Sequence, residues 1–363
     1  MSEYRADLID AANAMIDRAG PSHEVPLQHA DDAVWRALHD AGFTTLGVPE
    51  ESGGSGGSLS DALEIVSVLS RRGAATPIVE HSVLAAWIAA EAGLSLGDDI
   101  ATVSTKGEIA VRDDGAGGLI LDGRLEAVVW GELARTVVVV IPREPTCHVA
   151  LVSTDHASVT VLPGTDTTGI PVNDIVLSGT PVTCHGCAEN VVRDDVIRRG
   201  ALAYTTASAA AARAVCDATV RYAGERTQFG RPLAKFQAVQ QRLAQLASVT
   251  KAVETAAATA RESVDADAPS SAVDVAAAAS FVFASAREIG AAGHQIHGAI
   301  GFTSEHALGR STTSLWAWRE RWESEEYWAD QVASRVLDQG FDLWDVVTGF
   351  EPGRDIVKGE ISA

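Results

Sequence analysis

The stretch RYAGERTQFGRPLAKFQAVQQRLA, residues 221–244, decides the fold. Tyr222 and Arg226 are four residues apart, so a helix places both on one face. Gly230 is expected to end that helix, and Pro232 to begin the next one at its first position, where proline is favoured. The helical spacing that follows predicts one buried face, made of Leu233, Phe236, Val239, Leu243 and Leu246.

Arg226 stands at the corner between these two helices and is followed by Thr227, Gln228 and Phe229. A guanidinium at such a corner presents a planar fork of N–H donors that matches the oxygens of a phosphate group. The alternative is an ordinary ion pair between this arginine and a neighbouring acid. The segment by itself leaves both interpretations open.

A second informative segment is HQIHGAIGFTSEHALGR, residues 294–310. Gln295 and His297 are expected to end a helix, and Gly298 permits a ligand to approach the backbone closely. Taken alone, the same residues also suit a tight connection between two helices.

The order of elements along the chain predicts an α+β fold with segregated layers. A chain of 363 residues is too long for one hydrophobic core, so two or three sub-domains are expected. Residues 1–97 have helical spacing. Residues 98–195 consist of short valine- and isoleucine-rich runs between turn residues, which is typical of a small antiparallel barrel or sandwich. Residues 196–363 return to alanine-rich helices, which predicts a C-terminal helical bundle.

Composition and charge exclude several classes of partner. The chain has 28 basic and 49 acidic residues, a formal charge of −21, which repels phosphate backbones and anionic lipid surfaces. Nucleic-acid and membrane partners are therefore not expected. No apolar stretch is expected to span a bilayer, and the N-terminus does not have the pattern of a signal peptide. Four cysteines do not make a disulfide framework, so a cytoplasmic protein is predicted.

Two short motifs are weak. Residues 53–57 match the nucleophile-elbow pattern G-x-S-x-G, but a Pro-Glu-Glu loop precedes them where that motif needs a strand, so a surface turn is predicted. Cys184 and Cys187 have C-x-x-C spacing, with Cys147 and His148 upstream. They lack the remaining spacing of a zinc site, and no metal is expected.

The two C-terminal segments and an N-terminal W-x-x-L-x-x-x-G…L-G-V-P-E-E-x-G-G run, residues 35–54, resemble the acyl-CoA dehydrogenase family. The resemblance extends over nearly the whole chain. It implies a helical, then β, then helical fold, and a tetramer built as a dimer of dimers with FAD bound between subunits. It also implies α,β-dehydrogenation of an acyl-CoA thioester, in which a carboxylate removes the α-proton and the β-hydride passes to the flavin.

The same resemblance assigns cofactor contacts to both C-terminal segments. In the family these segments reach the ADP half of a neighbouring subunit's FAD, and an electron-transfer flavoprotein or a similar protein accepts the electrons. The flavin-binding candidates implied for this chain are Arg226, Gln228, Phe229, Gln295, His297 and Gly298.

The chain departs from the family pattern where the flavin ring would lie. The T-E-P-x-x-G-S-D loop that covers the ring is missing from residues 101–123, and Val128-Val129-Trp130 replaces the W-I-T segment. The Y-E-G-T motif of the catalytic base is replaced by residues 319–330, in which Glu323 is nearest to the base and is the catalytic candidate. The family's alternative base position falls near Gly200, which carries no carboxylate.

Two groups of side chains have more than one interpretation. Four tryptophans near this stretch either line an acyl pocket or form a packed seam: Trp316, Trp318, Trp322 and Trp328. The double arginines Arg71-Arg72 and Arg198-Arg199 are interpreted as solvated surface charge, with CoA phosphate contacts as the alternative.

One hypothesis explains both the retained and the missing motifs. The chain resembles the smaller, β subunit of actinobacterial α2β2 heterotetrameric acyl-CoA dehydrogenases, which serve steroid side-chain degradation. A longer paralogous subunit would then hold the flavin ring and the base. The alternatives are a self-sufficient homotetrameric dehydrogenase that uses Glu323, and a non-catalytic scaffold subunit that kept only the fold.

Overall fold

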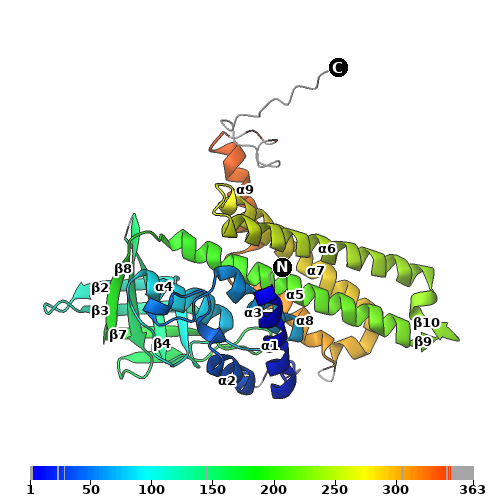
Figure 1. Cartoon of the computed structure of the whole chain (residues 1–363), viewed down its shortest axis with the longest axis horizontal. Coiled ribbons are helices and arrows are strands. Elements are labelled where there is room, and N and C mark those ends of the chain that lie inside the picture. Colours follow the sequence, from blue (N-terminus) through cyan, green and yellow to red (C-terminus); the bar gives the residue numbers. More distant parts are fainter. Residues whose placement is uncertain are drawn as a thin grey trace.

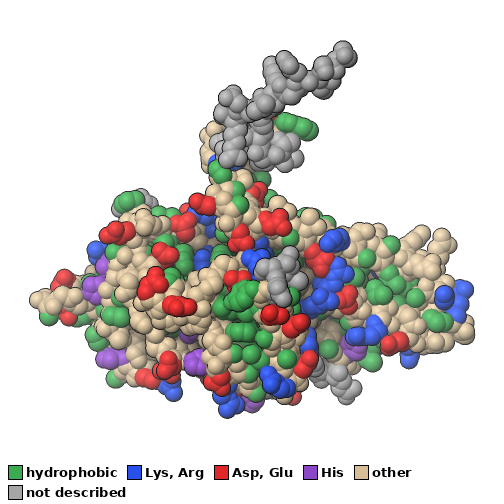
Figure 2. Space-filling view, viewed as in Figure 1, with side chains coloured by type: hydrophobic (Ala, Val, Ile, Leu, Met, Phe, Trp, Pro, Cys, Tyr) green, Lys and Arg blue, Asp and Glu red, His purple; other side chains and the backbone are tan. Residues whose placement is uncertain are grey.

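The computed structural model describes residues 3–22, 24–27, 29–143, 145–303, 306–340, 342 and 344. A β-sandwich lies at one end of the molecule, long helices extend to the other end, and N-terminal helices cover the junction between them (Figure 1). This arrangement confirms the expected α+β architecture. Acidic side chains are spread over much of the face in Figure 2, in agreement with the formal charge of −21.

The N-terminal helices form the first layer. Their bounds are α1 (Glu3–Ala19), α2 (Asp32–Asp40), η1 (Phe43–Thr45), η2 (Glu50–Ser52), α3 (Leu59–Arg72), the π-helical η3 (Val79–Ala86) and α4 (Trp87–Glu91). Helix α3 begins with a capping box in which Ser58 and Asp61 each accept the other's backbone N–H. This cap satisfies donors that would otherwise be unpaired at the helix start.

The middle region is a sandwich of two four-stranded sheets. Its strands are β1 (Ala101–Ser104), β2 (Gly107–Asp113), β3 (Leu119–Val129), β4 (Thr136–Arg143), β5 (Thr146–Ser153), β6 (Val159–Leu162), β7 (Val172–Pro181) and β8 (Cys184–Ala188). The sheet orders are β1-β4-β5-β8 and β2-β3-β7-β6. Buried side chains such as Leu121, Val139 and Ile175 fill the space between the sheets. One pairing, β1 with β4, is parallel and so departs from the antiparallel pattern expected from the sequence.

The C-terminal helices pack along one another. They are α5 (Arg193–Glu225), α6 (Gln237–Asp265), α7 (Ser271–His297), η5 (Gly298–Phe302), α8 (Leu308–Trp318) and α9 (Glu325–Leu337). Alanines such as Ala211 on α5 and Ala279 on α7 are fully buried. Small side chains at these positions permit close packing of long helices.

The corner between α5 and α6 differs from the predicted one. Helix α5 ends at Glu225, and a hairpin of β9 (Thr227–Gln228) and β10 (Arg231–Pro232) follows it. Phe229 and Gly230 form the turn with φ of 51° and 80°, the backbone that a two-residue hairpin requires. Gly230 therefore makes a strand turn instead of ending the helix. Pro232 lies in the hairpin, and after η4 (Leu233–Lys235) helix α6 begins at Gln237.

The predicted buried face of α6 is only partly buried. Leu246 is 2% exposed. The other four residues of that face are half-buried: Leu233, Phe236, Val239 and Leu243. The spacing identified the apolar face correctly, but the other elements of this chain leave four of its five side chains only half-buried.

Residues Ser271–Phe302, which include α7, are long and apolar enough by composition to cross a membrane. The sequence analysis expected no such stretch, because alanines dominate it. In the structure 61% of the apolar window is buried, since α7 packs against α5 and α6. Burial of this kind is typical of a helix in the core of a helical bundle.

Candidate functional site

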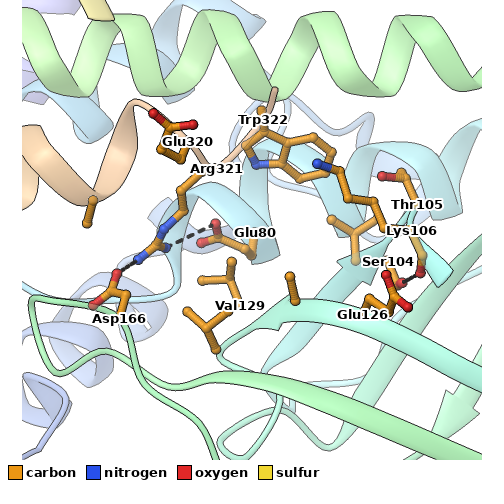
Figure 3. Close-up of a pocket in the computed structure, with 14 residues that line it drawn as sticks. Glu80, Ser104, Thr105, Lys106, Glu126, Val129, Asp166, Glu320, Arg321 and Trp322 are labelled. Atoms are coloured by element: carbon orange, nitrogen blue, oxygen red, sulfur yellow. Dashed lines mark hydrogen bonds and ion pairs between the residues drawn. The ribbon is translucent and has the colours of Figure 1, made fainter. Parts of the chain in front are cut away.

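A pocket of about 180 Å³ lies where the N-terminal helices, the sandwich and the C-terminal helices meet (Figure 3). Segment η3 contributes Glu80, and strand β3 contributes Val129. The segment that follows α8 contributes Arg321 and Trp322, which project toward the pocket from above in this view. All three parts of the chain are therefore needed to form its walls.

A buried charge network forms one wall of the pocket. Arg321, whose side chain is 4% exposed, pairs with Asp166 from the β6–β7 loop and donates to the Tyr204 hydroxyl at 3.0 Å. Tyr204 in turn donates to the Glu80 carboxylate. The Arg321 Nη1 atom lies 4.0 Å from Glu80 Oε1. Figure 3 shows how Arg321 reaches both carboxylates.

Burial sets the protonation behaviour of this network. Burial raises the pKa of Glu80, against the attraction of Arg321. Burial also raises the pKa of Tyr204 well above its ordinary value, so the phenol keeps its proton and donates it to Glu80. Burial opposes the charge of Arg321, but Tyr204, Asp166 and Glu80 outweigh it and raise the pKa of that guanidinium. Within the network the buried charge of Arg321 is balanced by the nearby carboxylates, and Tyr204 links it to Glu80 by hydrogen bonds.

Trp322 fills the neighbouring space. Its indole lies against Gly200 of α5, and a Cβ at residue 200 would be 2.3 Å from the indole Cδ2 atom. The side chain is 6% exposed and lines the same pocket as Val129. Val129, from the segment that stands in place of W-I-T, therefore lines the same pocket as Trp322, and Gly200 lies behind the indole.

Glu323 lies beside this pocket. Its Oε1 atom is 3.1 Å from Lys106 Nζ, and its φ of 66° is in the left-handed region. It lines a separate cleft of about 430 Å³, together with Lys106 and Arg193. This ion pair with Lys106 occupies the carboxylate of Glu323. Glu325 at the start of α9 pairs with Arg319 at 2.5 Å.

The β9–β10 hairpin carries three of the flavin-binding candidates to the far end of the bundle (Figure 1). Arg226 caps α5, and its side chain is exposed, as is that of Gln228. Phe229 at the turn is 90% exposed. No carboxylate of the described residues forms an ion pair with Arg226, so the acid-pair alternative finds no support there.

The other three candidates end helix α7. Gln295 is exposed and accepts from Arg242 of α6. His297 is 4% exposed, and its Nδ1 donates to the Gly293 carbonyl at 2.8 Å. Gly298 has φ 66° and ψ −144°, a conformation that essentially only glycine adopts. A Cβ there would meet nothing within 4 Å, so the backbone on this side is open.

Stacked aromatic rings join the two C-terminal segments. The Tyr222 ring of α5 stacks on the His297 imidazole with centroids 4.4 Å apart. The His306 ring meets the His297 ring edge-on, with centroids 4.8 Å apart. His297 therefore supports this corner from inside, while Arg226, Gln228, Phe229, Gln295 and Gly298 lie on the surface. The two segments thus meet through the stacked Tyr222 and His297 rings, and the role of the six candidates in flavin binding stays a prediction.

The sequence analysis missed the buried network of Glu80, Asp166, Tyr204 and Arg321. One signal was available, because Glu80 is an isolated acid within the apolar run from Thr76 to Ala90. Asp166 and Arg321 come from loops whose pairing depends on the tertiary fold. Nothing local in their sequence indicates the contact.

The weak motifs have structural explanations. Residues 53–57 form an exposed turn that a 3₁₀ helix precedes, and Ser55 Oγ contacts Thr45 Oγ1 at 2.7 Å. Cys184 and Cys187 lie on β8 as free thiols. Within the described residues, no group of three or more His, Cys, Asp or Glu side chains is arranged to hold a metal ion.

Three of the four tryptophans pack between elements. Trp318, Trp322 and Trp328 are 9%, 6% and 1% exposed, and the Trp328 indole donates to the Trp322 carbonyl at 2.9 Å. Trp316 is 46% exposed. The packed-seam interpretation holds for the buried three, although Trp322 also forms a wall of the pocket.

Comparison with known proteins agrees with this geometry. The acyl-CoA dehydrogenase N-terminal domain model matches residues 4–94, and the acyl-CoA dehydrogenase C-terminal domain model matches residues 192–318. The acyl-CoA dehydrogenase IpdE2 of Mycobacterium tuberculosis is 30% identical over 279 residues, which cover 77% of this chain and 78% of that protein. The chain belongs to the acyl-CoA dehydrogenase family, whose members are flavin-dependent oxidoreductases.

Two further comparisons bear on assembly. The acyl-CoA dehydrogenase FadE34 of Mycobacterium tuberculosis is 29% identical over 307 residues, and the match covers 82% of this chain but 41% of FadE34. The chain thus spans less than half the length of that relative. The solved structure of the ChsE4-ChsE5 complex from Mycobacterium tuberculosis contains a chain with the same fold, at a TM-score of 0.84 and 23% identity, covering 94% of this chain and 99% of that one.

Proposed function

We propose that this chain is the smaller subunit of an α2β2 acyl-CoA dehydrogenase. In this assembly a longer paralogous subunit holds the flavin ring and the catalytic base, and this chain grips the ADP end of that subunit's FAD. One contrast supports the proposal: Trp322 and Arg321 narrow the chain's own pocket, whereas the Arg226 fork at the far end of the bundle is exposed and unpaired in the described part of the chain.

The chain's own pocket does not fit a flavin ring and a thioester. Cofactor and substrate sites usually enclose about 300–1,000 Å³. The space left beside Trp322 is about 180 Å³. Widening it requires moving the indole off Gly200 and separating Arg321 from Asp166. Breaking such a buried pair leaves uncompensated charges and costs several kcal/mol.

The far end of the bundle does fit a diphosphate. Arg226 offers an unpaired planar fork, and Gly298 leaves open backbone in the segment that the Tyr222–His297 stack joins to it. Phe229 is held outward by the hairpin turn, ready to pack against a partner or an adenine ring. These features support a contact that is completed by another subunit.

When bound, FAD supplies the hydride acceptor for α,β-dehydrogenation. In the proposed complex Arg226 and the backbone at Gly298 hold the diphosphate, and Gln228 and Gln295 orient polar groups of the ADP moiety. His297 positions the turn from beneath through its stack on Tyr222. Glu323 stays paired with Lys106 and does not remove the α-proton.

The similarity to a chain of the ChsE4-ChsE5 complex supports a heteromeric assembly, because the name of that structure describes two different proteins. By the same analogy the substrate is the CoA thioester of a steroid or lipid side chain, and an electron-transfer flavoprotein or a similar protein accepts the electrons. The cytoplasmic location also stays a prediction.

The two alternatives make different demands on the chain. A homotetramer that uses Glu323 must release that carboxylate from Lys106 and empty the pocket beside it. A scaffold subunit has no use for an unpaired Arg226 fork. The heterotetramer keeps the Glu323–Lys106 pair intact and gives the exposed Arg226 a function.

The test is the visible absorption spectrum of the chain purified alone and of the chain co-expressed with a longer paralogue that contains the T-E-P-x-x-G-S-D loop. We expect a colourless chain alone and a yellow complex that reduces a dye when acyl-CoA is added. A yellow chain that is active alone supports the homotetramer. A stable complex whose flavin content and activity do not depend on this chain supports the scaffold.

A further inference from the structure

A second cleft, of about 440 Å³, lies on α5 and is separate from the pocket beside Trp322. Helix α4 forms one wall with Trp87 and Glu91, and α5 contributes Arg198, Arg199 and Leu202. The first turns of α7 close the other side. The cleft shares no lining residue with the pocket of Figure 3.

Arg199 is the distinctive group of this cleft. Its guanidinium stacks on the Trp87 ring, 4.2 Å from the centroid, and its Nε atom donates to the Val83 carbonyl at 2.7 Å. These two contacts fix the side chain in one position. Both terminal nitrogens have no hydrogen-bond partner among the described residues. Arg199 is thus a positioned half-buried cation with unused donors, and not the solvated charge expected from the sequence.

The other charged groups that line the cleft already have partners. Arg198 pairs with Asp195, and Asp195 also accepts the Val192 N–H that begins α5. Glu91 accepts the Trp87 indole N–H at 3.1 Å and does not form an ion pair with Arg199. Burial lowers the pKa of Arg199 to about 9, so the guanidinium keeps its charge at neutral pH.

The rest of the lining is mainly apolar. Leu59, Val191, Leu202, Val264 and Val275 contribute the hydrophobic surface of the cleft. A fixed cation beside apolar walls is complementary to a molecule that has one anionic head and an apolar body.

We propose that this cleft binds a carboxylic acid with an apolar body, whose carboxylate pairs with the terminal nitrogens of Arg199. A planar carboxylate can accept one N–H from each of the two terminal nitrogens of the fork. A dianion is less suitable, because Glu91 and Asp195 lie on the same walls and repel a second negative charge. For the same reason the multiply charged CoA moiety is a poorer match for this cleft than a monoanion.

The experiment is a calorimetric titration of the full chain with decanoate at pH 7.5, below the micellar concentration. We expect saturable binding of one decanoate per chain, and a dissociation constant about tenfold higher or more for Arg199→Gln. Decyltrimethylammonium, with the same tail and the opposite charge, should not saturate the site. Arg71→Gln is the matched control, because that exposed arginine pairs with Asp217 outside this cleft.

A second variant covers the case in which Arg199→Gln does not fold. Ala272→Phe places a ring in the cleft from the half-buried start of α7 and leaves Arg199 untouched. Its thermal unfolding should match the parent, and its decanoate binding should be lost. Absence of saturable decanoate binding, equal binding of decyltrimethylammonium, or unchanged affinity in a folded Arg199→Gln chain would overturn the proposal.

Discussion

Trp322 lies so close to Gly200 that a methyl group on residue 200 would be 2.3 Å from the indole Cδ2 atom. This contact joins the long helix α5 to the segment in which the family carries its catalytic base. Only glycine leaves room for an indole at this point. The pair therefore packs the space between helix α5 and the segment that follows α8.

Gly200→Ala is expected to destabilise the fold by about 1–3 kcal/mol, because the added methyl must displace the buried indole. Gly224→Ala is the matched control on the same helix, since a Cβ there meets nothing within 4 Å. That change should stabilise by about 0.5–1 kcal/mol through helix propensity. Urea unfolding of both variants measures the difference, and equal stabilities would contradict the steric argument.

Arg321→Gln should cost about 3–5 kcal/mol of stability, because it leaves Asp166 and Glu80 in the interior without their cation. Arg112→Gln removes an exposed ion pair with Asp122 and should change stability by less than about 1 kcal/mol. Denaturant midpoints of the two variants provide the comparison. A loss for Arg321→Gln no larger than that of the surface variant would show that the buried network contributes little.

His81 should make the fold sensitive to acid. Burial lowers the pKa of this 3% exposed imidazole to about 4, below its ordinary value near 6.5, and His39 adds to the effect. Between these two pH values the unfolded chain binds a proton that the native chain does not, so stability falls as pH decreases from 6.5 to 4. The contribution of this one group is about 3 kcal/mol.

The measurement is the unfolding free energy at pH 7 and pH 4.5, in the parent and in His81→Gln. The variant should lose less stability over this interval. Identical pH dependence in the two proteins would assign the acid sensitivity to other groups.

Arg226→Ala should reduce flavin retention by the complex at least tenfold, because the proposed diphosphate contact is a charge-assisted hydrogen bond. Both subunits should remain folded, since the Arg226 side chain is exposed. The flavin-to-protein absorbance ratio after gel filtration is the measurement. Arg112→Ala, on the sandwich at the other end of the molecule, is the control. Undiminished flavin content in Arg226→Ala would reject the contact.

Glu323→Gln should leave turnover of the complex within about twofold of the parent, because this carboxylate is paired with Lys106 and lies outside the pocket of Figure 3. Steady-state dye reduction with a saturating acyl-CoA measures it. A collapse of kcat with unchanged flavin content would assign the base to this chain and favour the homotetramer.

The sequence predicted the fold because its signals are local and repeated. Valine-rich runs between turn residues predicted the sandwich, and alanine-rich helical spacing predicted the bundle. The R-T-Q-F-G-R-P segment and the Q-I-H-G segment pointed to the family, and the structure brings them together through the Tyr222 and His297 rings. An error occurred at Gly230, which was expected to end a helix and instead forms a hairpin turn. Both structural roles need a residue with φ above zero, so the sequence alone does not distinguish them.

The sequence by itself determined the family, the order of the three structural regions, and the loss of the motifs that cover a flavin ring. These properties depend on periodicity and on short motifs, which the chain carries whatever its neighbours are. Only the tertiary structure decided what replaces the missing motifs. Arg321 meets Asp166 and Glu80, and Trp322 meets Gly200, across separations of more than a hundred residues. Such contacts depend on volume and charge in three dimensions, so no local pattern specifies them.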